Sequence, residues 1–198
     1  MIVAAFDFDG TLTRGDTLFP FLRFVSGYPR FAAKSCMIAP TLCRLAVANI
    51  DNHTAKERVL RRFLLGRSRD ELADLGRQFA DRVLPRMLRR EAMDRLRWHQ
   101  ELGHNCILLS ASLDIYLEPW ARHERFDKLA CSVLEMDGAG RATGALKGRN
   151  CYGAEKVRRL RELIDEGEIS ELYAYGDNKG DQDVLAIANH AYHRKFSE

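Results

Sequence analysis

The chain has 198 residues, of which 46% are hydrophobic and 30% are charged, so it can bury one good core and a small second module. Its 31 basic and 28 acidic residues leave a formal net charge of +3, a near balance that gives no indication of nucleic-acid binding. The five cysteines form no CxxC pair and are odd in number, which argues against a zinc site and a complete disulfide framework and favours a reducing compartment.

The first predicted element is a buried strand over residues 2–6, an apolar run that ends at Asp7. The chain enters this strand directly, without the charged start and long apolar run of a signal peptide. We therefore expect no export and a cytoplasmic location.

A long helical segment is predicted next, over residues 15–95. Its apolar residues recur at helical spacing in two groups, namely Leu18, Phe21, Leu22 and Val25, and Leu72, Leu75, Phe79 and Val83. Ser68 and Glu71 form a capping box that opens one of these helices.

The remainder of the chain alternates between strands and helices. The predicted elements are a strand over residues 106–109, a helix carrying Leu113, Tyr116, Leu117 and Trp120, a hairpin with arms 128–136 and 141–146, a helix over 153–165, and a strand over 172–175. This alternation predicts an α/β fold with a Rossmann-like parallel sheet. The core would comprise residues 1–14 and 96–198, with residues 15–95 as an inserted all-helical cap.

The segment Asp7-Phe8-Asp9-Gly10-Thr11 carries the clearest indication of chemistry. Two carboxylates at i and i+2 on a strand end, followed by Gly and Thr, predict a turn that is open to a ligand. The alternative is an acidic turn without a ligand. Ser110 and Lys156 are two further candidates. The alternative interpretation of Ser110 is a helix N-cap, and that of Lys156 is a surface lysine.

The segment from Asp7 to Thr13 matches the DxDGT[LV]T signature of the haloacid dehalogenase superfamily. The other three motifs follow in order, with Ser110 at a strand end, Lys156 in a helix and GDxxxD over residues 176–181. The resemblance covers essentially the whole chain and implies the haloacid dehalogenase fold with a type-one cap. It is most similar to subfamily IB, which contains phosphoserine phosphatase-like and phosphatidylglycerophosphatase C-like enzymes.

This resemblance implies a magnesium-dependent phosphatase that passes through an aspartyl-phosphate intermediate. Asp7 would be the nucleophile, and Asp9 would be the general acid and base. The resemblance further implies that Mg²⁺ is held by the carboxylates of Asp7 and Asp177 and by the backbone carbonyl of Asp9. Oxygen ligands of this kind suit a hard cation.

The resemblance also implies roles for residues around the phosphate and the metal. Ser110, Lys156 and Gly10 would bind the phosphate oxygens. Asp181 would order the metal-bound waters without touching the ion. As an alternative, Asp181 is a helix N-terminal charge, and the two roles are compatible.

Asp16 and Thr17 are the candidate residues of the cap that read the substrate. Asp16 lies nine residues after Asp7, where phosphoserine phosphatase has a glutamate that reads the substrate amine. Motif two reads Ser110-Ala111-Ser112 in place of Ser-Gly-Gly, and Gly180 replaces an asparagine. These departures weaken the assignment of phosphoserine as the substrate, and a phosphoserine-type phosphatase stays open as an alternative.

Residues 17–50 contain no Asp or Glu, whereas basic residues punctuate an apolar series. Lys34, Pro40 and Arg44 interrupt the stretch and argue against a membrane span. Two interpretations stay open, the interior of a helical cap or a surface that meets an anionic membrane or phospholipid. The first interpretation is favoured, and the resemblance of residues 151–157 to the motif-three neighbourhood of phosphatidylglycerophosphatase C agrees with the second. The predicted substrate is thus a small or lipid-linked organic phosphate.

Two other functions remain open at this point. A receiver-like phospho-accepting switch also places acids and a lysine around Mg²⁺, although receivers are single domains of about 120 residues without such an insertion. A phosphotransferase or a ligand-binding pseudoenzyme would keep the same fold. The pseudoenzyme is disfavoured because every motif side chain is present.

Overall fold

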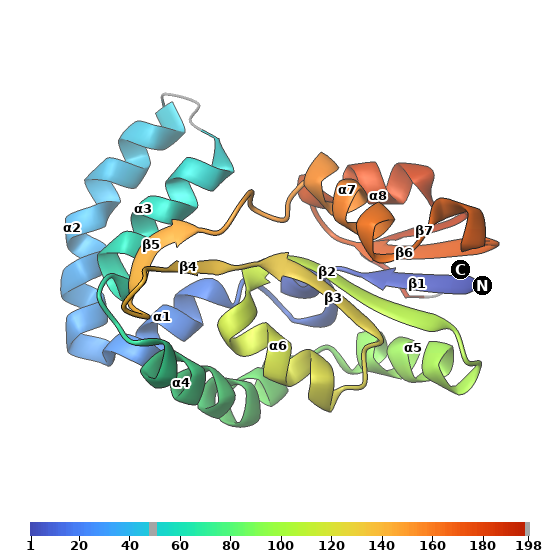
Figure 1. Ribbon diagram of the computed structural model, residues 1–198, viewed down its shortest axis with the longest axis horizontal. Coiled ribbons are helices and arrows are strands. Elements are labelled where there is room, and N and C mark those ends of the chain that lie inside the picture. Colours follow the sequence, from blue (N-terminus) through green and yellow to red (C-terminus); the bar gives the residue numbers. More distant parts are fainter. Residues whose placement is uncertain (48–50, 197–198) are drawn as a thin grey trace.

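A five-stranded parallel sheet forms the centre of the computed structural model, which describes the backbone of residues 1–47 and 51–196 and the side chains of residues 1–39, 51–165 and 167–196. The strands lie in the order β3-β2-β1-β6-β7 (Figure 1). They are β1 (Ile2–Phe6), β2 (Asn105–Leu113), β3 (Lys128–Ser132), β6 (Glu171–Gly176) and β7 (His190–His193). The register places Phe6 between Leu108 and Tyr175. The predicted α/β class is confirmed, and the C-terminal segment adds β7 as an edge strand.

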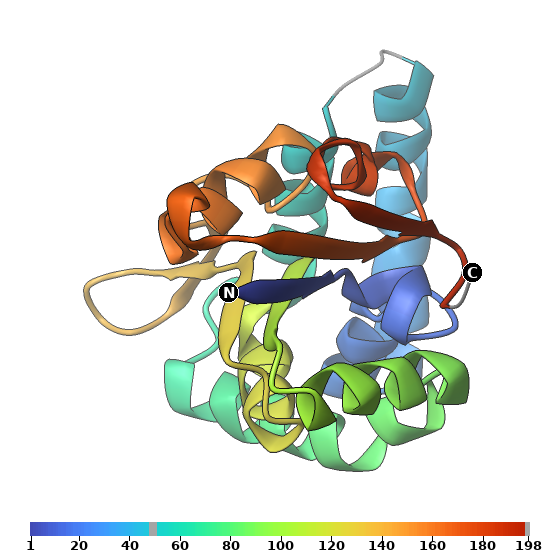
Figure 2. The same cartoon turned by 90° about the vertical axis from the view of Figure 1, so that its right-hand side faces the viewer.

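Helices cover both faces of this sheet (Figure 2). The helices α5 (Arg90–Glu101) and α6 (Asp114–His123) lie on one face, and α7 (Ala154–Leu163) and α8 (Gln182–Ile187) lie on the other. Ala4 and Phe6 point to the first face, whereas Val3 and Ala5 pack with the second. Because both faces are covered, a central strand is apolar at every position, which is why residues 2–6 were recognisable in the sequence.

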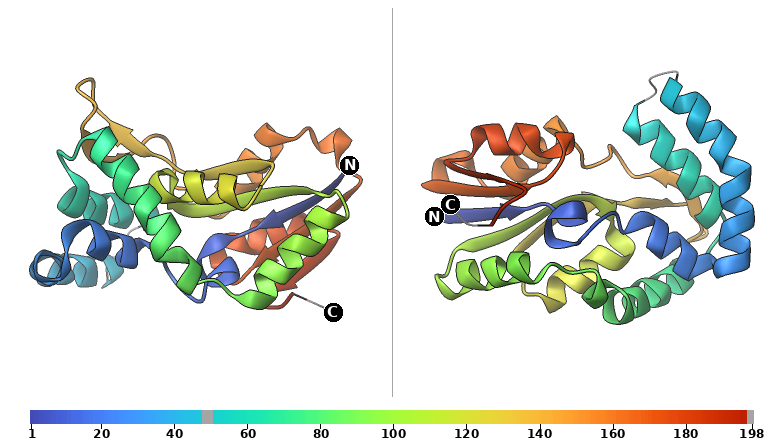
Figure 3. Two further views of the ribbon diagram at one scale, coloured as in Figure 1. Left: turned by 90° about the horizontal axis from the view of Figure 1, so that it is seen from below. Right: turned by 180° about the vertical axis from the view of Figure 1, so that it is seen from behind.

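Four further helices form a group at the end of the sheet away from the two termini (Figure 3). They are α1 (Leu18–Ser26), α2 (Tyr28–Val47), α3 (Asn52–Leu64) and α4 (Arg69–Arg82). The predicted capping box of α4 forms in its N-cap half, because the Ser68 hydroxyl accepts a hydrogen bond from the Glu71 amide at 3.2 Å, whereas the Glu71 carboxylate pairs with Arg67. α4 packs on α6 so closely that a Cβ on Gly76 would lie 2.1 Å from the Ile115 carbonyl oxygen. The cap therefore rests directly on a core helix.

The predicted hairpin is wrong in its first arm. Residues 128–136 do not form one strand, because Lys128–Ser132 joins the parallel sheet as β3 and only β4 (Leu134–Met136) pairs antiparallel with β5 (Ala142–Leu146). The buried residues Ala130 and Cys131 anchor the first part against β2. Apolar periodicity alone does not reveal this change of partner.

The hairpin β4–β5 reaches away from the sheet toward the helical cap (Figure 1). The Gly66 amide donates to the Ala142 carbonyl at 2.8 Å, and a Cβ on Gly144 would lie 2.3 Å from the Cα of Arg61 in α3. Two strands from the second half of the chain thus join the segment that the sequence predicted as all-helical. The division at residues 15–95 stays a prediction, and α5, which begins inside that range, packs on the sheet.

In the described part of the chain, no helix combines the length and the apolar character needed to cross a bilayer. The cysteines whose side chains are described are free thiols, namely Cys36, Cys106, Cys131 and Cys151.

Candidate active site

The predicted motif residues meet at the carboxyl edge of the parallel sheet. Asp7 directly follows β1, Ser110 lies within β2, and Asp177 directly follows β6. The Asp7 amide donates to the Tyr175 carbonyl at 2.9 Å, which ties the end of β1 to β6. Neighbouring parallel strands end at the same edge, so three distant segments deliver their polar side chains to one place.

Gly10 permits a close approach between the turn after β1 and the turn after β6. Its φ is +83°, in the left-handed region, and a Cβ at this position would lie 2.2 Å from Asp177 Oδ2. Only glycine fits both conditions. Its amide donates to Thr13 Oγ1 at 3.3 Å, so the turn also closes on itself.

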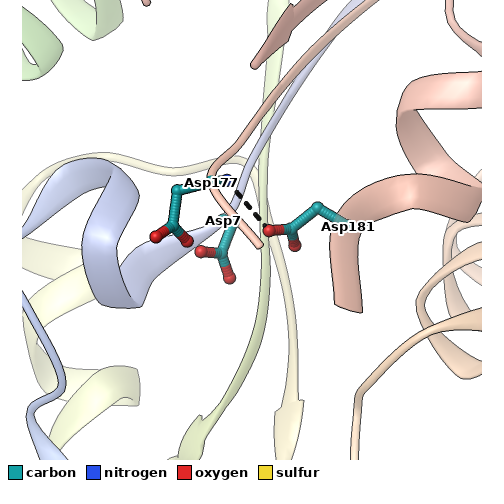
Figure 4. A group of neighbouring side chains, drawn as sticks. All are labelled: Asp7, Asp177 and Asp181. Carbon is teal, nitrogen blue, oxygen red and sulfur yellow. Dashed lines mark hydrogen bonds between the residues drawn. The ribbon is translucent and has the colours of Figure 1, made fainter. Parts of the chain in front are cut away.

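Three carboxylates, those of Asp7, Asp177 and Asp181, offer oxygens that lie within 4.8 Å of one another (Figure 4). The buried ammonium of Lys156 lies against this group, with Nζ at 2.6 Å from both Asp7 Oδ1 and Asp181 Oδ1. Lys156 is only 2% exposed, so the alternative of a surface lysine is wrong. Burial by itself would lower the pKa of Lys156, but Asp7 and Asp181 raise it and keep the side chain charged.

The carboxylate oxygens of this cluster are suitable ligands for a divalent cation. Both oxygens of Asp181 are already engaged, Oδ1 by Lys156 and Oδ2 by the amides of Asp177 at 3.0 Å and Asn178 at 3.1 Å. Burial raises the pKa of Asp7 to about 7, while Lys156 opposes the shift. A bound cation would stabilise the ionised form of Asp7, as Lys156 does. Asp181 also completes the capping box of a short helical turn with Asn178, so its role at a helix N-terminus is confirmed.

Asp9 is held by a network of hydroxyl groups. Its Oδ1 accepts from the Thr17 amide at 2.9 Å and from the Thr17 hydroxyl at 2.6 Å, and its Oδ2 accepts from the Ser112 hydroxyl. The buried Tyr116 hydroxyl lies 3.0 Å from both the Ser112 and Thr17 hydroxyls. Burial, and then the charge of Asp16, raise the pKa of Asp9 to about 6 against these donors. Thr17 was predicted to contact the substrate, but its amide and hydroxyl groups donate to Asp9 instead.

Ser110 is 1% exposed, and its Oγ accepts a hydrogen bond from the Ser112 amide at 3.0 Å. The N-cap residue of the following helix α6 is Leu113, so the interpretation of Ser110 as an N-cap is wrong. The pairing of β2 with β3 is irregular between Leu109 and Leu113, and Ser110 and Ser112 line the same cavity.

A cavity of about 350 Å³ opens above these residues, between the sheet edge and the cap. Its walls include Asp7, Asp9, Ser110 and Lys156 from the core and Asp16, Leu18, Phe19 and Lys56 from the cap segment. Asp16 is exposed at this cavity and accepts from the Phe19 amide at 3.2 Å. A small phosphate ester would thus meet the motif residues and the cap at the same time.

Two residues of this cavity, Lys56 and Asn150, were missed by the sequence analysis. Lys56 Nζ donates to the Ala111 carbonyl, and it lies 3.2 Å from Asn150 Oδ1. One signal was available for Lys56, because it shares a helix face with the apolar residues at i+3, i+4 and i+7 of α3. Nothing in the sequence marked Asn150, which lies in a loop before α7.

The whole arrangement can be compared with known proteins. The model of the haloacid dehalogenase-like hydrolases matches residues 4–186. Protein CicA of Caulobacter vibrioides is 34% identical over 195 residues, which cover 98% of this chain and 86% of CicA.

Solved structures share the fold. A protein of unknown function from Bordetella pertussis Tohama I superposes with a TM-score of 0.80 at 26% identity, covering 94% of this chain and 86% of its own. A phosphoserine phosphatase, solved as an analogue of its phospho-aspartyl intermediate, superposes with a TM-score of 0.67 at 16% identity. The match covers 94% of this chain and 83% of the phosphatase chain. With a family model that spans nearly the entire sequence, the chain belongs to the haloacid dehalogenase-like hydrolases, as its four motifs predicted.

Proposed function

We propose that this hydrolase is a magnesium-dependent phosphomonoesterase of subfamily IB that forms an aspartyl-phosphate at Asp7. The observation that carries the proposal is the placement of Asp7 at the floor of the cavity, between the Lys156 ammonium and two further carboxylates. The structural neighbour described as a phospho-aspartyl intermediate analogue supports the same chemistry.

In the proposed reaction, a carboxylate oxygen of Asp7 attacks the phosphorus of the ester. A bond forms between that oxygen and phosphorus, the ester P–O bond breaks, and Asp9 gives its proton to the departing oxygen. Asp9 then takes a proton from water as the water attacks phosphorus, which releases phosphate and restores Asp7. The raised pKa of Asp9 suits a group that must hold a proton in one step and accept one in the next.

The phosphate oxygens need fixed positive groups and donors around them. Lys156 and the Ser110 hydroxyl line the cavity beside Asp7 and would supply a charge and a hydrogen bond. The amide of Gly10 is assigned to the same task and would exchange its contact with Thr13 for one with phosphate.

Asp7 and Asp177 are the carboxylates that would hold Mg²⁺, together with the backbone carbonyl of Asp9. When bound, the cation supplies charge neutralisation at the phosphate oxygens. Asp181, whose two oxygens are already bonded, would position the metal-bound waters and Lys156.

The proposed substrate is a small or lipid-linked organic phosphate. The cap segment contributes apolar walls, Leu18, Phe19 and Val59, to the cavity. A cavity of about 350 Å³ would hold a head group and leave a longer tail outside. A receiver-like switch does not account for the hydrolase family or for the helices above the site.

The test is release of inorganic phosphate from a panel of phosphomonoesters that includes phosphoserine and phosphatidylglycerophosphate. Asp7→Asn should lower the release by a factor on the order of 10³ or more, because an amide is a poor nucleophile and a weak ligand of the cation. Asp183→Asn, at an exposed carboxylate on α8, is the matched control and should behave as wild type. Near-normal turnover by the Asp7 variant would refute the mechanism.

Hydrolysis and transfer are separated by one further measurement. With glycerol added as an acceptor, hydrolysis yields free phosphate, whereas transfer yields phosphorylated glycerol. We expect free phosphate to dominate.

A further inference from the structure

The ring of Tyr152 packs directly on the backbone of the GDxxxD motif. A Cβ added to Gly180 would lie 2.4 Å from Cε2 of this ring and 2.9 Å from its Cζ. The φ of Gly180 lies outside the left-handed region, so its backbone conformation does not require glycine. The ring alone excludes a side chain at residue 180, and its present position depends on that glycine.

Backbone hydrogen bonds fix the loop that carries this ring. The Gly153 amide donates to the Gly180 carbonyl at 2.9 Å, which joins the loop before α7 to the GDxxxD motif. The Tyr152 amide donates to the Asn150 carbonyl at 2.8 Å, and the Tyr152 carbonyl accepts from the Glu155 amide at 3.3 Å. The ring is therefore held beside the active site by contacts on both sides of it in the sequence.

Tyr152 lies where two cavities meet. Asn52, Asn150 and Tyr152 line both the cavity above Asp7, of about 350 Å³, and a neighbouring cavity of about 610 Å³. Asn150 is buried, and its Oδ1 is bonded to the Ser132 hydroxyl at 2.7 Å. Tyr152, in contrast, is 37% exposed. Its ring thus offers an apolar surface to a group that extends from one cavity into the other.

We propose that Tyr152 is a specificity-determining residue whose ring contacts the leaving group where it passes from the cavity above Asp7 into the second cavity. The inference rests on the proposed phosphatase function and adds a substrate class, organic phosphates whose leaving group carries an apolar portion several atoms from the ester oxygen. Methylene groups that leave water to lie on the ring stabilise the bound substrate. A short leaving group ends before it reaches the ring and gains nothing from it.

The test compares ethyl phosphate with hexyl phosphate, both at concentrations at which they are monomeric. The two esters share the reacting group and differ only in chain length. The wild-type enzyme should favour hexyl phosphate by about tenfold or more in kcat/KM, because each methylene that leaves water adds to binding. Tyr152→Ala should lower this ratio about fivefold, mainly through KM for hexyl phosphate, since part of the apolar contact is lost.

Two control variants separate the ring from other effects. Tyr152→Phe keeps the ring and should keep the ratio. Tyr28→Ala removes a more exposed ring, on α2, that lines neither of the two cavities, and it should leave the ratio as in wild type.

The contact between Tyr152 and Gly180 gives an independent test. Gly180→Ala places a Cβ where the ring lies and should displace the ring, so the ratio of hexyl to ethyl phosphate should fall as it does in Tyr152→Ala. The double variant Tyr152→Ala with Gly180→Ala should have the ratio of Tyr152→Ala alone, because both changes remove the same contact.

The inference is wrong if the wild-type enzyme hydrolyses both esters without preference or if Tyr152→Ala keeps the wild-type ratio. An equal loss on both esters in Tyr152→Ala would also overturn it, because the ring would then act in the fold and not on the leaving group. Losses that multiply in the double variant would show that the two residues act separately. Absence of phosphate release from both alkyl esters and from p-nitrophenyl phosphate would instead refute the phosphatase function itself.

Discussion

Asp9 is fixed by three hydrogen bonds, two from Thr17 and one from Ser112. This geometry gives a specific expectation for Asp9→Asn. The amide cannot transfer a proton, so hydrolysis should slow by about 10²–10⁴-fold. Metal binding should persist, because the proposed ligand at this position is the backbone carbonyl.

The loss should depend on the leaving group. Alkyl phosphates, whose alkoxides need a proton to depart, should suffer more than p-nitrophenyl phosphate. Steady-state kcat for one ester of each type, measured in wild type and Asp9→Asn, checks this expectation. An equal loss for both esters would contradict the acid role of Asp9.

At the scale of elements, α5 is attached to the sheet through a buried histidine. His99 is fully buried, with Nε2 at 2.9 Å from the Tyr175 hydroxyl and Nδ1 at 2.7 Å from His104 Nδ1. Burial, followed by the charges of Arg95 and His104, lowers the pKa of His99 from 6.5 to about 3. The folded protein therefore keeps this ring neutral where the unfolded chain would protonate it.

This difference predicts that His99 contributes a loss of stability in acid, whereas Asp7 and Asp9, whose pKa values are raised to about 7 and about 6, contribute in the opposite direction. Below pH 6.5 the unfolded chain binds a proton at His99 that the folded chain does not, so the His99 contribution to the free energy of unfolding should fall as pH falls toward 3, by up to about 1.4 kcal/mol per pH unit. Urea unfolding between pH 7.5 and 4.5 measures the slope. His99→Gln should remove a positive contribution, so the free energy of unfolding should rise less steeply or fall more steeply with pH than in wild type, whereas His123→Gln, at an exposed ring on α6, should leave the slope unchanged. A His99 variant with the wild-type slope would contradict the assignment.

The elements differ in how well the sequence predicted them, for physical reasons. β1 was predictable because a strand covered on both faces is apolar throughout, and its end at Asp7 follows from the change to polar residues. The split between β3 and β4 was not predictable from the sequence, because the choice of pairing partner depends on β2 and α3, which are distant in sequence. Asn150 was missed for the same reason, since its place in the cavity arises only from tertiary packing.

At the scale of the whole molecule, the described side chains of the acid-free segment of residues 17–50 are of two kinds, buried and exposed. Phe21, Leu22 and Ile38 are buried, which agrees with a cap interior. Tyr28 and Met37 are 73% and 64% exposed. The side chains of residues 40–50 in this segment lie outside those described, so the surface interpretation depends on residues 17–39.

Four basic side chains interact with one another electrostatically, and we refer to them as the basic cap face, namely Arg30, Lys34, Arg62 and Arg67. Arg62 contacts the exposed Met37, and Arg67 is also paired with Glu71. The pKa of Lys34 is lowered by burial and then by Arg67, Arg62 and Arg30, which shows that like charges gather here. Lys34 Nζ also lies 5.5 Å from the centre of the Phe63 ring. Positive charge next to exposed apolar side chains is the combination that binds anionic membrane surfaces.

We therefore predict that phospholipid monoesters outcompete phosphoserine and that the protein sediments with anionic vesicles. The expected kcat/KM is higher for phosphatidylglycerophosphate than for phosphoserine, and vesicle binding should weaken between low and high salt because screening shortens the reach of surface charges. A double variant, Arg30→Ser with Lys34→Ser, should reduce sedimentation, whereas Arg90→Ser with Arg122→Ser, at exposed positions on α5 and α6, should not. If phosphoserine is the far better substrate and vesicles are not bound, residues 17–50 act as cap interior alone.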